Sequence, residues 1–369
     1  MEKSTVYYSD LRTESMKNNL QLKLKKLIQT AGIEKIDFEK KFTAIKMHFG
    51  EPGNLAFLRP NYAKTVVDMV SELGGLPFLT DCNTLYVGRR KNALDHIGAA
   101  YENGFSPFST GCHILIGDGL KGTDETLVPV DGDYVREAKI GRAVMDADII
   151  ISLTHFKGHE ATGFGGTLKN LGMGCGSRAG KKEMHSNSKP VVNQPLCIGC
   201  GKCLQICAQD APAITHGKSF IDHDLCVGCG RCIAVCPTGA IANRTDLQNE
   251  ILNCKIAEYA YAVVKDRPNF HISLVIDVSP NCDCHDENDL PIVPDVGMFA
   301  SFDPVALDQA CADAVNRQPV IAGSWLDDVQ RTTNDHFTDA HPETNWQSCL
   351  DQAVKIGMGR REYELITVK

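Results

Sequence analysis

The sequence predicts an α/β protein: a body with a mostly parallel β-sheet, built in two halves, and a short cysteine-rich domain inserted between them. Apolar runs alternate with helical patterns before the cysteine-rich stretch, and the alternation resumes after it. Such alternation is typical of mostly parallel sheets with helices on their faces. We expect an N-terminal α/β half at residues 1–190, the inserted domain at 191–245 and a C-terminal α/β half at 246–369.

The N-terminal half contains four strand-like runs separated by helical patterns. Helices are expected near Asn61–Leu73 and Lys91–Glu102. The strand-like runs are FTAIKMHF at 42–49, LPFLTDC at 76–82, HILIGDG at 113–119 and ADIIISLTHF at 147–156. The last run is continuously apolar and β-branched, which indicates a strand buried on both faces.

The C-terminal half repeats the pattern. Helical periodicity at 247–264 precedes the strand-like runs FHISLVIDV at 270–278 and VGMFASF at 296–302. The helix that begins with DPVALDQACADAV has Asp303 as its expected N-cap and Pro304 at its first position. We interpret Asp303 and Asp308 as carboxylates that favour a helix N-terminus.

Composition excludes several classes of protein. A formal charge of −8 gives no basic footprint for nucleic acid. No apolar run approaches the roughly 18 residues of a membrane span, and the first residues lack a signal peptide's apolar core, so we expect a soluble cytoplasmic protein. A homodimer is the default assembly. Sixteen cysteines in a chain of 369 residues favour metal ligation over a disulfide framework.

The cysteines concentrate in two copies of one pattern, CIGCGKCLQICA from Cys197 and CVGCGRCIAVCP from Cys226, 29 positions apart. Each copy has the C-x2-C-x2-C-x3-C spacing and resembles a bacterial two-cluster ferredoxin domain, in which the fourth cysteine of each copy ligates the other cluster. Ala208 replaces the proline usual after the first copy. The implied ligands of two 4Fe–4S clusters are Cys197, Cys200, Cys203 and Cys236 for the first, and Cys226, Cys229, Cys232 and Cys207 for the second.

A glycine-rich stretch follows the buried strand that ends near residue 156. Gly163, Gly165 and Gly166 would allow backbone amides to surround a phosphate or another anion, and Lys169 would add positive charge. The segment is not a Walker A loop, because Cys175 stands where its first glycine should be. The alternative is a surface loop with solvated lysines.

The order His159, GFGG, Lys169, His185 resembles the nucleotide-binding segment of the lactate racemase family, in which a lysine carries a nickel-pincer nucleotide and a downstream histidine helps to hold the metal. The resemblance implies Lys169, His185 and His159 as catalytic candidates. A phosphate-binding D-x-T-R motif of that family is loosely echoed in DCNTLYVGRR, by Asp81, Thr84, Arg89 and Arg90. The racemase carries no ferredoxin domain.

A closer resemblance, over nearly the whole chain, is to an uncharacterised family of ferredoxin-containing 4Fe–4S proteins, a domain of unknown function distantly related to the racemase. It is carried by THFKGHEATGFGGTLKNLGMGC, CDC and DPVALDQA. No activity is implied by this family.

A second cysteine group, NCDCH, follows the strand-like run at 270–278. Cys282 and Cys284 suit a soft metal or a cluster but are too few for a closed site. Cys175 is the preferred third ligand; the further candidates are Cys112, Cys254 and His185. The alternative is a pair of reduced thiols beside a turn, and His155 either joins the site or caps its strand.

We therefore predict an iron–sulfur redox protein that transfers electrons through two 4Fe–4S clusters to a cleft in the α/β body. The cleft would hold a small-molecule substrate and an additional metal, cluster or nucleotide, and a redox partner protein would exchange electrons with the clusters. Two alternatives stay open: an electron-transfer partner without a reaction of its own, and a racemase-like enzyme with an organometallic nucleotide on Lys169.

Overall fold

The computed structural model describes residues 3–13, 15–187, 189–242 and 247–369. Its centre is an eight-stranded sheet with the strand order β16-β1-β15-β14-β7-β2-β3-β4. The strands are β1 (Ser4–Ser9), β2 (Phe42–Lys46), β3 (Leu76–Asp81), β4 (Ile114–Ile116), β7 (Ile149–His155), β14 (Asn269–Val275), β15 (Gly297–Ser301) and β16 (Tyr363–Thr367). Within this sheet β15 runs antiparallel to both neighbours, and every other pair is parallel.

The prediction of an α/β body with a large, mostly parallel sheet is confirmed. β2, β3, β4 and β7 lie within the four predicted runs, β15 lies within the run at 296–302, and β14 overlaps the run at 270–278 but begins one residue before it. Both halves of the body contribute to one sheet, because β14 from the second half pairs with β7 from the first. β1 and β16 were not predicted; they pair in parallel at the edge of the sheet.

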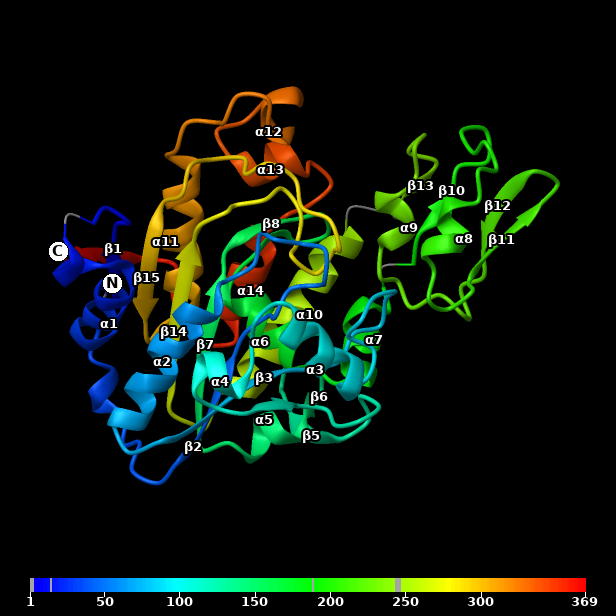
Figure 1. Ribbon diagram of the computed structural model, residues 1–369. Coiled ribbons are helices and arrows are strands. Elements are labelled where there is room, and N and C mark those ends of the chain that lie inside the picture. The colour runs from blue at the N-terminus through cyan, green and yellow to red at the C-terminus, as the bar shows by residue number, and fades with distance from the viewer. Residues whose placement is uncertain (1–2, 14, 188, 243–246) are drawn as a thin grey trace.

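Helices cover both faces of the sheet (Figure 1). On one face lie α1 (Leu20–Thr30), α2 (Pro60–Glu72) and α3 (Ala93–Glu102), and on the other lie α6 (Thr167–Cys175), α10 (Leu247–Val264), α11 (Pro304–Asn316) and α14 (Gln347–Lys355). Side chains alternate along each strand. In β7, Ile150 joins one hydrophobic core while Ile149 and Ile151 join the other. The sheet is therefore packed between two hydrophobic cores, one on each face.

The backbones of α6 and α10 approach closely. A Cβ atom on Gly172 of α6 would lie 2.1 Å from the carbonyl oxygen of Ile256 on α10, so only glycine fits there. This contact fixes the height of α6 above the sheet, and α6 begins directly after the GFGG segment.

The remaining elements of the body are short connections. They are α4 (Pro107–Thr110), α5 (Arg142–Asp146), α7 (Arg178–His185), α12 (Trp325–Asp328), α13 (His336–Ala340), two 3-10 turns (Met16–Asn18 and Ile33–Lys35), the hairpin of β5 (Glu125–Pro129) with β6 (Glu137–Gly141), and the hairpin of β8 (Lys157–His159) with β9 (Gly163–Gly165). Among the described residues no helix combines the length and apolarity needed to cross a bilayer.

The cysteine-rich segment at residues 191–242 lies beside the body rather than in its sheet (Figure 1). It contains β10 (Val191–Val192), α8 (Lys202–Ile206), β11 (Pro212–Thr215), β12 (Lys218–Ile221), α9 (Arg231–Ala234) and β13 (Ile241–Ala242). β10 pairs with β13, and β11 pairs with β12. Because β7 and β14 are neighbours in the sheet, the segment belongs to the long crossover between them. We call residues 191–242 the inserted segment.

Candidate functional site

A cavity lies beyond the ends of β2, β3 and β7, at the edge where parallel sheets usually bind ligands. We call it the strand-end cavity. Its lining includes the following residues: Lys46, His48, Asp81, Thr84, Arg90, His155, Lys157, Gly165, Gly166, Lys169, Lys181, Cys282 and Cys284. The two cysteines come from the loop after β14, so this loop, and not a fourth strand end, closes the cavity.

Three sulfur and nitrogen ligands meet at this loop. Potential ligand atoms of His159, Cys282 and Cys284 all lie within 4.8 Å of one another, and all three side chains are buried. His159 ends β8, and the backbone N–H of Ala161 donates to its Nδ1 at 3.1 Å. The ammonium of Lys169 lies 3.7 Å from Cys282 Sγ. The structure thus brings together Cys282, Cys284, His159 and Lys169, four of the residues that the sequence singled out.

The two thiols differ in acidity. A hydrogen bond from Cys284 holds the pKa of the Cys282 thiol well below its usual range, and the positive charges of Lys169 and Lys157 act in the same direction. The same hydrogen bond and burial raise the pKa of Cys284. Cys282 is therefore the more acidic of the two thiols.

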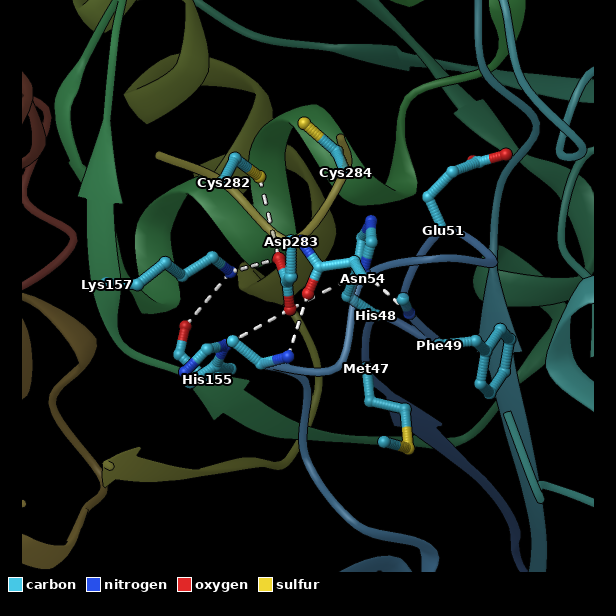
Figure 2. Close-up of polar contacts among 12 residues, drawn as sticks. Met47, His48, Phe49, Glu51, Asn54, His155, Lys157, Cys282, Asp283 and Cys284 are labelled. Atoms are coloured by element: carbon cyan, nitrogen blue, oxygen red, sulfur yellow. Dashed lines mark hydrogen bonds and ion pairs between the residues drawn. The ribbon is translucent and has the colours of Figure 1, made fainter. Parts of the chain in front are cut away.

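Asp283, between the two cysteines, anchors the loop to the sheet. Its carboxylate is fully buried, 2.9 Å from Lys157 Nζ and 3.1 Å from His155 Nδ1, with His48 Nδ1 at 3.6 Å. Figure 2 shows Asp283 between Lys157, His155 and Cys282. Although burial alone would raise its pKa, Lys157 and the two histidines hold the pKa of Asp283 well below its usual range.

A second buried ion pair holds the other side of the loop. Arg90 Nε lies 2.6 Å from the Glu51 carboxylate, and the Arg90 guanidinium also donates to the carbonyl oxygen of Cys284 at 3.2 Å. Of the four residues that loosely echo a phosphate motif, Asp81, Thr84 and Arg90 line the strand-end cavity, whereas Arg89 pairs with Glu102 at the surface. Asp81 itself pairs with Lys46 at 3.0 Å.

The N-terminus of α6, directly after the GFGG segment, is occupied by a carboxyl group of the chain itself. The first two N–H groups of α6, from Thr167 and Leu168, already donate to the carboxylate of Asp308 at 2.7 and 2.9 Å. A Cβ on Gly166 would lie 2.6 Å from the same carboxylate.

Of the three glycines, Gly163 alone has a positive φ, 80°, and it packs against Trp346. Gly165 and Gly166 still line the cavity. The segment is shaped by internal packing, and its contribution of charge to the cavity is Lys169.

His185 and Cys175 lie apart from each other. His185 ends α7 and lines a second cavity; its Nδ1 has no partner among the described residues, and burial, followed by His159 and Lys169, lowers its pKa to about 4. Cys175 ends α6 in the core, where burial raises its pKa to about 11, and it is not among the described residues that line either cavity. Cys112 belongs to the core on the opposite face of the sheet, and Cys254 lies on α10.

The second cavity joins the body to the inserted segment, and we call it the junction cavity. Its lining includes His159, Lys169, His185, Cys229, Arg231 and Cys284. Arg231 spans the boundary: its guanidinium lies 2.9 Å from His285 Nδ1 and donates to the carbonyl of Val87 at 3.2 Å. Five residues line both cavities and so separate one from the other: Tyr86, Lys169, Met173, Lys181 and Cys284.

The eight cysteines of the repeats divide between two further cavities in the inserted segment. One is lined by Cys197, Cys200, Cys203 and Cys236, and the other by Cys207, Cys226, Cys229 and Cys232. In each copy the glycines on either side of the second cysteine have positive φ: Gly199 and Gly201 in the first, Gly228 and Gly230 in the second. The two copies therefore share their local backbone geometry.

Several residues of the site carried no signal of their own in the sequence. Lys46 and His48 lie inside the predicted run at 42–49, and Lys157 directly follows the run at 147–156, but a lysine or histidine at such a position is common. Asp283 stood in the CDC motif between two noticed cysteines. His155, for which two roles were open, joins the site through Asp283 and also pairs with the carbonyl of Ile276 at 2.8 Å.

Comparison with known protein families identifies a match over residues 43–313, which covers most of the chain and includes the sheet strands from β2 to β15, both cavities and the inserted segment. The chain belongs to the DUF362 family, described as a domain of unknown function. The sequence predicted membership in a family defined as a domain of unknown function, and the match agrees with this prediction. The prediction was based on the motifs THFKGHEATGFGGTLKNLGMGC, CDC and DPVALDQA.

Individual relatives of this DUF362 protein are distant. Thylakoid-associated protein sll1697 of Synechocystis sp. is 30% identical over 124 residues, and the match spans 34% of this chain and 35% of that protein, about a third of its length. The lactate racemase apoprotein from Thermoanaerobacterium thermosaccharolyticum has a similar structure, with a TM-score of 0.34, 10% identity and coverage of 74% of this chain and 51% of that one. A Thermotoga maritima protein gives a TM-score of 0.38 at 14% identity, covering 82% and 60%.

Proposed function

We propose that this DUF362 protein is an iron–sulfur redox protein, in which a two-cluster ferredoxin-like domain at residues 191–245 exchanges electrons with the body cavities. Its flanks at 1–190 and 246–369 would form one catalytic body; the boundary at 245 lies outside the described residues. When bound, 4Fe–4S clusters supply one-electron transfer. Localisation in the cytoplasm and a homodimer are parts of this proposal.

The donor sets fit this cofactor. Each cavity of the inserted segment is lined by four cysteines, three from one repeat and the fourth from the other, as the crossed ligation of such domains requires. Backbone N–H groups also point at the sulfurs, Ser219 N to Cys197 Sγ at 3.3 Å and Gly228 N to Cys226 Sγ at 3.4 Å. Hydrogen bonds of this kind stabilise the extra electron of a reduced cluster.

The observation that carries the proposal is the position of Cys229. It lines the cavity of the second cysteine set and also the junction cavity, where it lies with His159, Lys169 and Cys284. Electrons held at the second set would therefore be next to the site in the body. A pure electron carrier has no need of a thiol-, lysine- and histidine-lined cavity at this boundary.

The first cysteine set faces outward. Cys200 is exposed and its neighbour Ile198 has 66% of its surface accessible. We propose that a redox partner protein exchanges electrons here, whereas a small-molecule substrate reacts in the strand-end cavity. The two ends of the electron path would then be separated by the inserted segment.

Anaerobic purification with iron and sulfide analysis and EPR of the reduced protein tests the proposal. The wild type should contain about eight iron and eight sulfide per chain. Cys200→Ser and Cys229→Ser should each remove one of two EPR signals, and Cys175→Ser, which changes a core thiol, should remove neither. Protein with no acid-labile sulfide after anaerobic reconstitution would refute the proposal.

The two alternatives are separated by further measurements. If changes at Lys169, His159 and Cys284 leave every spectrum and potential unaltered, the body does not communicate with the clusters and the protein is a carrier. An adduct on Lys169, detected by mass spectrometry of the intact anaerobic protein, would instead favour the racemase-like enzyme.

A further inference from the structure

We propose that His159, Cys282 and Cys284 form a mononuclear site for a borderline-soft divalent metal ion such as Zn²⁺, with a fourth position open toward Lys169. The inference deepens the proposed function and rests on it for the source of electrons, but metal binding is measured independently of the clusters. Two thiolates, one imidazole and an open position make a donor set typical of catalytic zinc sites.

The three ligands are close enough to close around an ion. Metal–sulfur bonds of about 2.3 Å and metal–nitrogen bonds of about 2.0 Å place tetrahedral ligand atoms roughly 3.5–3.8 Å apart. The ligand atoms here lie within 4.8 Å of one another. Side-chain rotations that draw them inward by about 1 Å would complete the site.

The backbone holds His159 beside the cysteine loop. The N–H of Gly158 donates to the carbonyl of Ser279 at 2.9 Å, and a Cβ on Gly158 would lie 2.1 Å from the carbonyl oxygen of Pro280. β8 therefore lies directly against the loop that carries the thiols. Since Gly158 and His159 are consecutive, this contact positions the imidazole.

The surroundings favour a cation between the thiols. Cys282 and Cys284 are both buried and their sulfur atoms lie within 4.8 Å of each other, and two thiolates buried this close together need a compensating cation. A divalent ion would supply that charge and displace the thiol protons, as metal binding to thiols generally does. Asp283 Oδ1 lies 3.5 Å from Cys282 Sγ and holds the loop through Lys157, so the ligands have an ordered outer shell.

The open position suits an anionic oxygen ligand. Within the described part of the chain, no carboxylate lies at ion-pair distance from Lys169 or Lys181, although both line the strand-end cavity. The Lys181 ammonium binds the carbonyl of Gly176 at 2.6 Å. Two ammonium groups without a carboxylate partner beside a metal position would select a small carboxylate or another oxyanion as substrate.

X-ray absorption at the zinc edge of the full-length protein, purified anaerobically and supplied with Zn²⁺, tests the site without interference from iron. We expect about one zinc per chain with two sulfur neighbours at about 2.3 Å and nitrogen or oxygen at about 2.0 Å. Cys282→Ser and Cys284→Ser should each lower the sulfur count to one, and His159→Asn should weaken zinc binding at least tenfold. Cys175→Ser, a matched buried thiol, should change nothing.

Three results would overturn the site: zinc retained unchanged in the Cys282→Ser/Cys284→Ser double variant, zinc surrounded by four sulfurs, or a Cys282–Cys284 disulfide in the anaerobic protein. Iron and sulfide measured on the same samples separate the two proposals. Full iron and sulfide without zinc refutes the metal site alone, whereas zinc at this site without sulfide refutes the clusters alone.

Discussion

Replacing Asp283 by asparagine should destabilise the body strongly, because it removes a charge without changing the shape of the side chain. Asp283 is the buried partner of Lys157, at 2.9 Å, with 0% and 8% of the two side chains exposed. In Asp283→Asn the ammonium of Lys157 would remain buried without a carboxylate. Breaking a buried pair in this way typically costs about 3–5 kcal/mol of unfolding free energy.

Urea denaturation followed by tryptophan fluorescence measures this loss, since both tryptophans, Trp325 and Trp346, belong to the body. A suitable control is Asp131→Asn, which breaks a surface pair with Arg136 at 2.9 Å whose side chains are 101% and 78% exposed. The control should leave the midpoint unchanged. Equal midpoints for the two variants would refute the idea that Asp283 is a buried anchor.

The pH dependence gives a second test of the same charge. The pKa of Asp283 is held below its usual value, so its stabilisation is present above the unfolded pKa of about 3.9 and is lost as the pH falls toward the folded pKa. The difference between wild type and Asp283→Asn should therefore be constant from neutral pH to about pH 5 and shrink below about pH 4. A difference that shrinks already between pH 8 and 6 would point to another group.

Two further predictions concern the core. Gly172→Ala should destabilise the protein by about 1–3 kcal/mol, because the new methyl group meets the Ile256 carbonyl. Gly98→Ala on α3, where a Cβ would lie 3.5 Å from the Arg89 guanidinium, an ordinary contact, should be neutral or stabilise by up to about 1 kcal/mol. Urea midpoints would check both, and the same effect for the two variants would contradict the close α6–α10 contact. Burial lowers the pKa of His271 to about 3. Because the unfolded chain then binds a proton that the folded chain does not, the free energy of unfolding should fall as the pH drops below about 6.5, by up to about 1.4 kcal/mol per pH unit for this group. Urea titrations at pH 7.5 to 5 would measure this fall, and it should be less steep in His271→Asn. An equally steep fall in the variant would contradict the lowered pKa of His271.

The strands that could be predicted were those with their own local pattern. ADIIISLTHF is apolar enough to indicate a buried strand by itself, and β7 forms within it. The helix at 247–264 was also marked by its periodicity and forms α10. β1 (STVYYS) and β16 (YELIT) gave weaker signals because both mix polar and apolar residues, and the pairing of Ser4 with Tyr363 joins the two ends of the chain. Such pairing depends on the whole fold and leaves no local pattern.

The candidate site, too, could be predicted from the sequence only in part. Cysteine spacing marked Cys282 and Cys284, but nothing local indicated which third residue would approach them. Cys175 is near the glycine segment in sequence and yet points into the core, whereas His159 is brought to the thiols by the β8 hairpin. The two cysteines could thus be singled out from the sequence, but the residue that lies beside them in space could not.

Asp308 occupies the N-terminus of the helix that follows the glycine segment, whereas an anion bound by the amides of Gly163, Gly165 and Gly166 stays a prediction. A helix N-terminus ordinarily attracts a negatively charged group. The carboxyl group of Asp308 reaches the N–H groups of Thr167 and Leu168 from α11, 141 and 140 positions away in sequence, and burial raises its pKa to about 7. With its first amides satisfied, α6 is held in place, and Lys169, in the same first turn, places its ammonium 3.7 Å from Cys282 Sγ.

The groups that support the cysteine loop differ from those that could react with a ligand. Two buried ion pairs hold the loop from two sides, and their charges are already paired: Asp283 with Lys157, and Arg90 with Glu51. Groups fixed in this manner lose little freedom when a ligand binds, which favours tight and specific binding. Lys169, in contrast, has a thiolate as its nearest anion and faces both cavities. With Lys181, which also lines both cavities, it is a cation whose charge a substrate could meet, and it shares the junction cavity with Cys229 of the inserted segment.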